Sequence, residues 1–305
     1  MRFPLALQRL HQPRAARRVA EPEHVFRAQY VESVLCLKSK PSELGLNTTR
    51  YDNFPYVHNR LNHISEHVPF SRPPHFCSLL NRSRVVHAVA MFLPWHRNFV
   101  ALYEEALRDC GYTGPMVYWD WSLEADTGLG GNGNRAEGGS DRKCVADGPF
   151  KDLRPAYYGD DYAPHCLSRN WNNGTDRPGD MIASTYTPDA VGEVMASQSY
   201  QDFRYSLEGG PHRAIHAAVG GDMSPATSPN DPLFFLHHTQ VDRLWWLWQQ
   251  QDPAARTTAF GGPRTQDEDS LEATLEDVMP FLGLAEDVQV SELMTTQSGR
   301  LCYVY

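Results

Sequence analysis

Histidine is the residue type in this sequence whose spacing most clearly suggests chemistry. The chain has 305 residues, and 13 of them are histidines. His212 and His216 are four positions apart, which places both imidazoles on one face of a helix. The adjacent residues His237 and His238 follow further along the chain. Two imidazoles from one helix and a third from another would form a site that copper, zinc, iron or nickel binds.

The first half of the chain holds a second group of histidines. His63 and His67 are also four positions apart and would form a pair by themselves, whereas His87 and His96 flank an apolar stretch. Spacing alone does not select a ligand set and leaves half of the group unassigned. The group consists of His58, His63, His67, His75, His87 and His96.

The elements that must position these histidines are predicted to be mainly helical. Apolar side chains recur at helical spacing, and prolines or glycines stand near several of the segment ends. Residues 127–180 are rich in Gly, Asn, Asp and Pro, which predicts a long loop, and Cys144 and Cys166 are placed to pin it. Residues 300–305 alternate as an edge strand does. The predicted helices span 22–38, 96–109, 211–218 and 231–251.

Composition excludes several classes of protein. Hydrophobic residues make up 41% and charged residues 21% of the chain, as in ordinary globular proteins. The net charge of −9 gives no electrostatic reason for nucleic-acid binding. No apolar run approaches the roughly 18 residues of a membrane span. We therefore expect neither a nucleic-acid nor a membrane partner.

Cysteines and glycosylation sequons favour a secreted glycoprotein with disulfide bonds over a reduced intracellular protein. The 6 cysteines are scattered and form no CxxC pair, which suits three disulfides but leaves their connectivity open. The first apolar run is too short for a signal-peptide core, and residues 1–20 are rich in arginine, so we treat them as an N-terminal arm of undecided origin. The cysteines are Cys36, Cys77, Cys110, Cys144, Cys166 and Cys302, and the sequons begin at Asn47, Asn81 and Asn173.

Three stretches of the sequence together resemble a known family. The segments MFLPWHRNFVALYEEALRDCGY with VYWDW, and DPLFFLHHTQVDRLWWLW, are similar to the two copper-binding regions of the tyrosinase and catechol oxidase family of type 3 copper proteins. The segment GGPHRAIHAAVGGDM resembles the stretch between them. The similarity covers residues 25–250 and Tyr303-x-Tyr305, and the cysteine pattern resembles fungal secreted members.

The resemblance implies a ligand set for two copper ions. His238 is selected over His237 because the family ligand lies four residues before the aspartate that matches Asp242. His237 would then pack behind the ligands or on the outer face of its helix, and His63, His67, His75 and His165 would be structural or surface residues. The implied ligands are His58, His87 and His96 for copper A, and His212, His216 and His238 for copper B.

Departures from the family pattern bear on the activity. Val85 stands where some members carry a thioether-forming cysteine, so no such crosslink is expected, and Cys77 is assigned to a disulfide. Glu208 resembles the glutamate that orients a water near copper B. Arg213 stands where monophenol-hydroxylating members have an asparagine, and a guanidinium offers only donors. One expectation is that Arg213 pairs with Glu208 and lowers its basicity. The alternatives are that Arg213 attracts an anionic substrate or is a solvated helix residue without effect, and Ala217 is too small to position anything polar.

Two further expectations concern the surroundings of the site. The small side chains Ala226 and Thr227 lie where family members place a residue over the copper entrance, so bulky phenols would be admitted. Asp242 resembles an aspartate that pairs with an arginine near the N-terminus, here Arg14 or Arg17. By the same resemblance, we expect a catalytic domain without the C-terminal lid domain of latent members.

These inferences predict a single catalytic domain over residues 21–305, a mainly α four-helix bundle around a dinuclear copper centre. A copper A helix near 50–63 would join the helices at 96–109, 211–218 and 231–251 in that bundle. The expected reaction is oxidation of o-diphenols to o-quinones with reduction of O2 to water. Alternatives are a tyrosinase that hydroxylates monophenols, an oxidase of o-aminophenols or substituted phenols, a hemocyanin-like O2 carrier, and a mononuclear zinc hydrolase with one metal per chain.

Overall fold

A computed structural model describes residues 14–15, 17–18, 24–62, 85–123, 133–135, 144–171 and 181–305. Several expectations fall outside these residues, namely those for His63, His67, His75, Cys77 and the sequons at Asn81 and Asn173. The side chains of Arg14 and Arg17 also lie outside the described part. Asn47, the first residue of the remaining sequon, is exposed.

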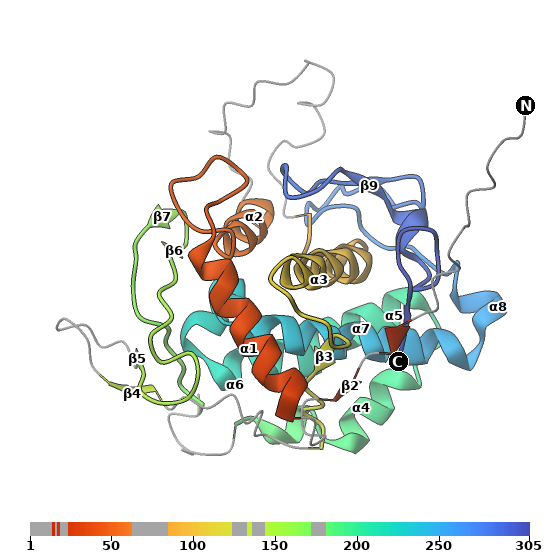
Figure 1. Ribbon diagram of the computed structural model, residues 1–305. Helices are drawn as coiled ribbons and strands as arrows, with labels where there is room; N and C mark the ends of the chain where they lie inside the picture. The colour runs from red at the N-terminus through yellow and green to blue at the C-terminus, as the bar shows by residue number, and fades with distance from the viewer. Residues whose placement is uncertain are drawn as a thin grey trace, which may run out of the picture.

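The described chain is mainly helical, as predicted (Figure 1). The helix expected at 96–109 begins earlier, and the one expected at 211–218 is preceded by a π-helical turn over Glu208–His212. Helices α4 and α5 were not predicted. No described helix is long and apolar enough to cross a membrane. The helices are α1 (His24–Ser39), α2 (Asn53–Asn62), α3 (Phe92–Arg108), α4 (Pro188–Met195), α5 (Tyr200–Leu207), α6 (Arg213–Val219), α7 (Leu233–Gln251) and α8 (Pro253–Arg256).

The strands are short and pair two by two, so they fasten loops rather than form a layer. The strand predicted at 300–305 is present as β10, which pairs in parallel with β1. The other pairs are β2 with β3 in parallel, and β4 with β5, β6 with β7 and β8 with β9 antiparallel. The strands are β1 (Arg14–Ala15), β2 (Arg17–Arg18), β3 (Val117–Tyr118), β4 (Gly133–Arg135), β5 (Cys144–Val145), β6 (Tyr157–Tyr158), β7 (Asp161–Tyr162), β8 (Val278–Met279), β9 (Val288–Gln289) and β10 (Tyr303–Val304).

Helices α3 and α7 pack against each other at the centre of the fold (Figure 1). Tyr103 of α3 and Phe235 of α7 stack with ring centroids 3.5 Å apart. Phe54 of α2 meets Phe235 edge to face at 5.5 Å, so three helices share one aromatic core. Burial of these large rings is the main stabilisation of the bundle that holds the histidines.

A buried ion pair joins the same two central helices. Arg97 of α3 donates to the carboxylate of Asp242 on α7 at 2.5 Å, and both side chains are almost wholly excluded from solvent. The hydroxyls of Tyr303 and Tyr305 donate to the other oxygen of Asp242. Among the described side chains, the ion-pair partner of Asp242 is therefore Arg97, which sequence reasoning did not consider.

Two disulfides tie loops to this helical core. Cys36–Cys110 joins α1 to the turn after α3, and Cys144–Cys166 closes part of the long loop, as its cysteines suggested. A bridge between residues that are 74 positions apart removes much conformational freedom from the unfolded chain. The long connections are thereby held without a sheet.

Candidate metal centre

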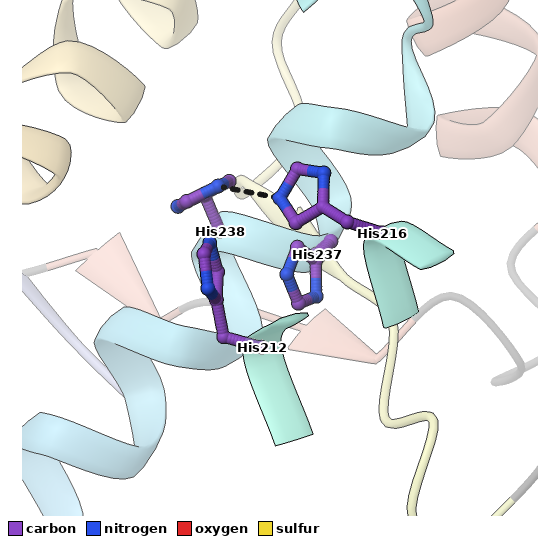
Figure 2. A group of neighbouring side chains, drawn as sticks. All are labelled: His212, His216, His237 and His238. Carbon is purple, nitrogen blue, oxygen red and sulfur yellow. Dashed lines mark hydrogen bonds between the residues drawn. The ribbon is translucent and has the colours of Figure 1, made fainter. Parts of the chain in front are cut away.

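Four histidines converge at the junction of α6 and α7 (Figure 2). His212 ends the π-helical turn, His216 lies one turn later on α6, and His237 and His238 lie on α7. Each offers a ring nitrogen, and these atoms all lie within 4.8 Å of one another. Nε2 of His216 and Nε2 of His238 are 3.4 Å apart. This is a close cluster of nitrogen ligands.

Three more histidines converge beside the first group. His58 comes from α2, His96 from α3, and His87 from the irregular segment before α3, and their ligand nitrogens also lie within 4.8 Å of one another. The rings of His96 and His238 stack with centroids 4.3 Å apart, so the two clusters adjoin. The structure thus brings together all six of the histidines that the resemblance selected, and His237 in addition.

The local sequence explains how α6 is set relative to α5. The π-helical turn contains Gly209, Gly210 and Pro211, and Gly210 leaves the helical region with φ −97° and ψ −110°. Proline removes a backbone donor and glycine tolerates the irregular dihedrals, so the helix changes phase here. That change directs His212 and His216 together toward α7.

Backbone carbonyls orient four of the imidazoles. A carbonyl oxygen only accepts, so each of these rings carries its proton on Nδ1, which makes Nε2 the nitrogen that can bind a metal. The Nδ1–H groups donate to the carbonyls as follows: His58 to Ala226 at 2.6 Å, His96 to Phe92 at 2.8 Å, His212 to Glu208 at 3.0 Å and His216 to Met223 at 2.7 Å.

The donor set fits a metal cation. Nε2 of His58 and Nε2 of His96 are 3.4 Å apart. Both nitrogens are unprotonated and carry a lone pair, because the proton of each ring is on Nδ1, which donates to a carbonyl. Two facing lone pairs repel each other unless a cation or a proton is shared with them. Within the described part of the chain, buried Nε2 of His212 also has no hydrogen-bond partner. Leaving such groups unsatisfied is costly, and metal ligation removes that cost.

A hydrogen bond from Trp121 distinguishes His237 from its neighbour. The indole N–H, which only donates, lies 3.0 Å from Nδ1 of His237. A neutral imidazole has one accepting nitrogen, so Nε2 of His237 carries the proton and has no lone pair for a metal. This contact agrees with the choice of His238 over His237. Trp121 lies in the VYWDW segment, but nothing local in that segment pointed to His237.

Burial favours the neutral form of several histidines in the two clusters. Burial lowers the pKa of His216 to about 4, although the Met223 carbonyl opposes that change. Burial and neighbouring histidines lower the pKa values of His87, His96 and His238 well below the ordinary value. Neutral imidazoles are the form that binds metals, so the site is prepared for ligation at neutral pH.

The expected ion pair between Arg213 and Glu208 is wrong. One carboxylate oxygen of Glu208 accepts the backbone N–H of Ala88 at 2.5 Å, and the other accepts from Arg204 at 2.9 Å. Arg213 is exposed at the start of α6. Burial raises the pKa of Glu208, while the Ala88 amide and Arg204 oppose that rise. The i,i+4 spacing of Arg204 and Glu208 was the signal that sequence reasoning missed.

Other predicted residues have simpler positions. Ala226 is half-buried and its carbonyl orients His58, whereas Thr227 is fully buried and does not border an entrance. His165 lies in neither cluster: its Nε2 faces Asp222 at 2.8 Å and its Nδ1 faces the carbonyl of Ala163. His165 is a structural histidine, as expected.

The sequence is similar to a family model and to several fungal proteins, all described as tyrosinases or tyrosinase-like. The family model described as the common central domain of tyrosinase matches residues 48–251. The chain is 36% identical over 294 residues to the tyrosinase-like protein phomQ2 of Diaporthe leptostromiformis, covering 91% of this chain and 69% of that protein. It is 36% identical over 292 residues to tyrosinase ustQ of Aspergillus flavus, covering 90% and 75%.

Solved structures show the same similarity. A variant of the polyphenol oxidase from Thermothelomyces thermophila matches with 29% identity and a TM-score of 0.76, covering 96% of this chain and 88% of that one. A functional unit of octopus hemocyanin matches with 21% identity and a TM-score of 0.52, covering 82% and 56%. The second similarity concerns the fold alone.

Proposed function

The chain belongs to the tyrosinase family of type 3 copper proteins, and from that premise we propose that it oxidises o-diphenols to o-quinones. Membership makes it an oxidase whose fold implies a dinuclear copper centre. The observation that carries the proposal is the meeting of two buried histidine clusters with stacked His96 and His238. Two o-diphenols supply the electrons that reduce one O2 to water.

The proposed ligands are the six histidines that the family motifs select, and His237 is left out because its Nδ1 accepts from Trp121. When bound, a copper pair supplies the electron transfer between the diphenol and O2. The chain contributes neutral imidazoles, backbone carbonyls that orient them, and aromatic walls: Phe234 lies 4.1 Å from His238 and Phe92 lies 4.9 Å from His212 between ring centroids. The ligands are His58, His87 and His96 for one ion, and His212, His216 and His238 for the other.

Diphenol oxidation is favoured over monophenol hydroxylation by the surroundings of Glu208. Hydroxylation of a monophenol requires a group near the site that takes up the phenol proton. Both oxygens of Glu208 already accept from Ala88 and Arg204, and exposed Arg213 brings only donors. A catechol binds through two oxygens and loses its protons more readily, so it depends less on such a base.

Oxygen uptake by copper-loaded protein tests the proposal. We expect rapid uptake with 4-methylcatechol and slow uptake with 4-methylphenol. Comparable rates with both substrates would make the protein a tyrosinase and overturn the argument from Glu208. Two bound coppers with reversible O2 binding and no turnover of phenols or o-aminophenols would instead indicate an oxygen carrier.

We also propose that the protein is secreted. Cys36–Cys110 and Cys144–Cys166 are structural disulfides, which persist in oxidising compartments. The exposed sequon at Asn47 is accessible to glycosylation. Protein recovered from culture medium should lose mass on glycosidase treatment and should shift in mobility on reduction. Purely intracellular, fully reduced protein would contradict this assignment.

A further inference from the structure

The segment that presents His87 has no regular structure and an unusual backbone. Ala88, the next residue, has φ +57°, which residues other than glycine rarely adopt. A strained conformation of this kind persists only when surrounding contacts hold it in place. The segment 85–91 should therefore be fastened from outside, and its fastenings decide where the His87 ring lies.

Among the described residues, four hydrogen bonds from distant parts of the chain hold residues 87–90 of this segment. Gln266 donates to the carbonyl of His87 at 2.6 Å, and Tyr200 donates to the carbonyl of Ala90 at 2.6 Å. The amide of Ala90 donates to the carbonyl of Pro263 at 2.9 Å. The fourth bond, from the amide of Ala88 to Glu208, is the one that comes from the element carrying the other cluster.

Glu208 is in contact with both histidine clusters. Its side chain accepts the amide next to His87, and its main-chain carbonyl accepts Nδ1–H of His212 at 3.0 Å. Arg204, one turn earlier on α5 and buried, donates to the second carboxylate oxygen at 2.9 Å. A carboxylate that faces two donors with its two oxygens is held in one orientation.

We propose that Glu208, held by Arg204, is a positioning residue that fixes the His87 segment against the turn carrying His212 and so aligns the two copper sites. This role rests on the proposed assignment of His87 and His212 as copper ligands. It differs from the role of a base toward the substrate, because the carboxylate acts here through the backbone of Ala88.

The chemistry of glutamine separates the two roles. A carboxylate accepts at both ends, whereas a carboxamide accepts at one end and donates at the other. In Glu208→Gln, either the Ala88 amide or Arg204 therefore faces an NH2 group. In the double variant Arg204→Met with Glu208→Gln, the opposing guanidinium is gone and the carboxamide oxygen is free to accept from Ala88.

The experiment is a copper-binding titration of the full chain. Copper per chain is measured by mass spectrometry after dialysis against increasing concentrations of a competing chelator, and the metal-free variants are compared by thermal melting. We expect Glu208→Gln to lose one of its two coppers at a chelator concentration about 10–100-fold lower than the original chain does. This is the usual effect of changing a group that orients a metal ligand. The carbonyl that orients His212 is unchanged, so the second copper should be retained. The double variant should recover binding of both.

Matched variants make the result decisive. Glu193→Gln, at an exposed position on α4, is the control and should bind copper as the original chain does. Unchanged copper binding in Glu208→Gln, with a loss confined to monophenol turnover, would overturn the positioning role and indicate a base. A double variant no better than the single one would also overturn it. If the original chain itself failed to bind two coppers, the proposed function would fail instead.

Discussion

Removing the charge of Asp242 should test the buried link between the central helices. Asp242→Asn keeps the shape of the side chain but leaves Arg97 as a buried cation without its partner. Arg97 is 1% exposed and Asp242 is 4% exposed, so solvent cannot compensate. Breaking a buried pair from one side costs about 3–5 kcal/mol. The guanidinium retains the carbonyls of Leu293 and Met294 and the ring of Trp245, which favours the lower half of that range.

The assay is urea unfolding of the metal-free protein, followed by tryptophan fluorescence. The midpoint should fall while the slope of free energy against urea stays constant, because the folded architecture is unchanged. Asp109→Asn is the matched control: its pair with Arg50 is at the surface, with the aspartate side chain 55% exposed, and should be worth at most about 1 kcal/mol. Equal, small losses in both variants would refute the reasoning from burial.

Three further predictions concern the site. Trp121→Phe removes the N–H that donates to Nδ1 of His237, so Nε2 of His237 no longer has to carry the proton. X-ray absorption of the copper-loaded variant should then show an additional imidazole ligand. The control Trp246→Phe, at a half-buried position, should show no additional ligand. Arg213→Gln should raise KM up to about fivefold for 3,4-dihydroxyphenylacetate and leave KM for uncharged 4-methylcatechol unchanged; equal effects on both would exclude charge attraction. The metal-free protein should lose stability as the pH falls below about 6.5. The reason is that the unfolded chain then binds protons that half-buried His216 of the folded protein, with its pKa lowered to about 4, does not bind. Each such histidine lowers the free energy of unfolding by at most about 1.4 kcal/mol per pH unit. Urea unfolding between pH 7.5 and pH 5 measures this loss, and a free energy of unfolding that does not change with pH would contradict the prediction.

Local sequence was sufficient for much of the fold and for selecting histidines that converge in the structure. The periodicity of apolar residues located α1, α3 and α7, because a helix buries one face wherever it packs. The spacing of His212 and His216 placed both on one helical face, and family motifs selected the remaining histidines. Helices α4 and α5 are short and were missed, although Thr187 and Ser199 cap them as N-terminal residues commonly do.

Partners far apart in the sequence were decided by tertiary structure alone. Arg97 and Asp242 are 145 positions apart, and Trp121 and His237 are 116 positions apart. Both pairs exist because the segments that carry them pack against α7, which no local pattern specifies. Arg204 and Glu208 differ, because their i,i+4 pair is local and its spacing is visible in the sequence. What the sequence does not specify is the π-helical turn that begins at Glu208, beyond which Arg213 faces solvent. The sequence by itself determined which side chains can bind metal, because ligand chemistry belongs to the residue. Packing determined which donors and acceptors hold those side chains, because hydrogen bonds depend on distances that only the folded chain sets.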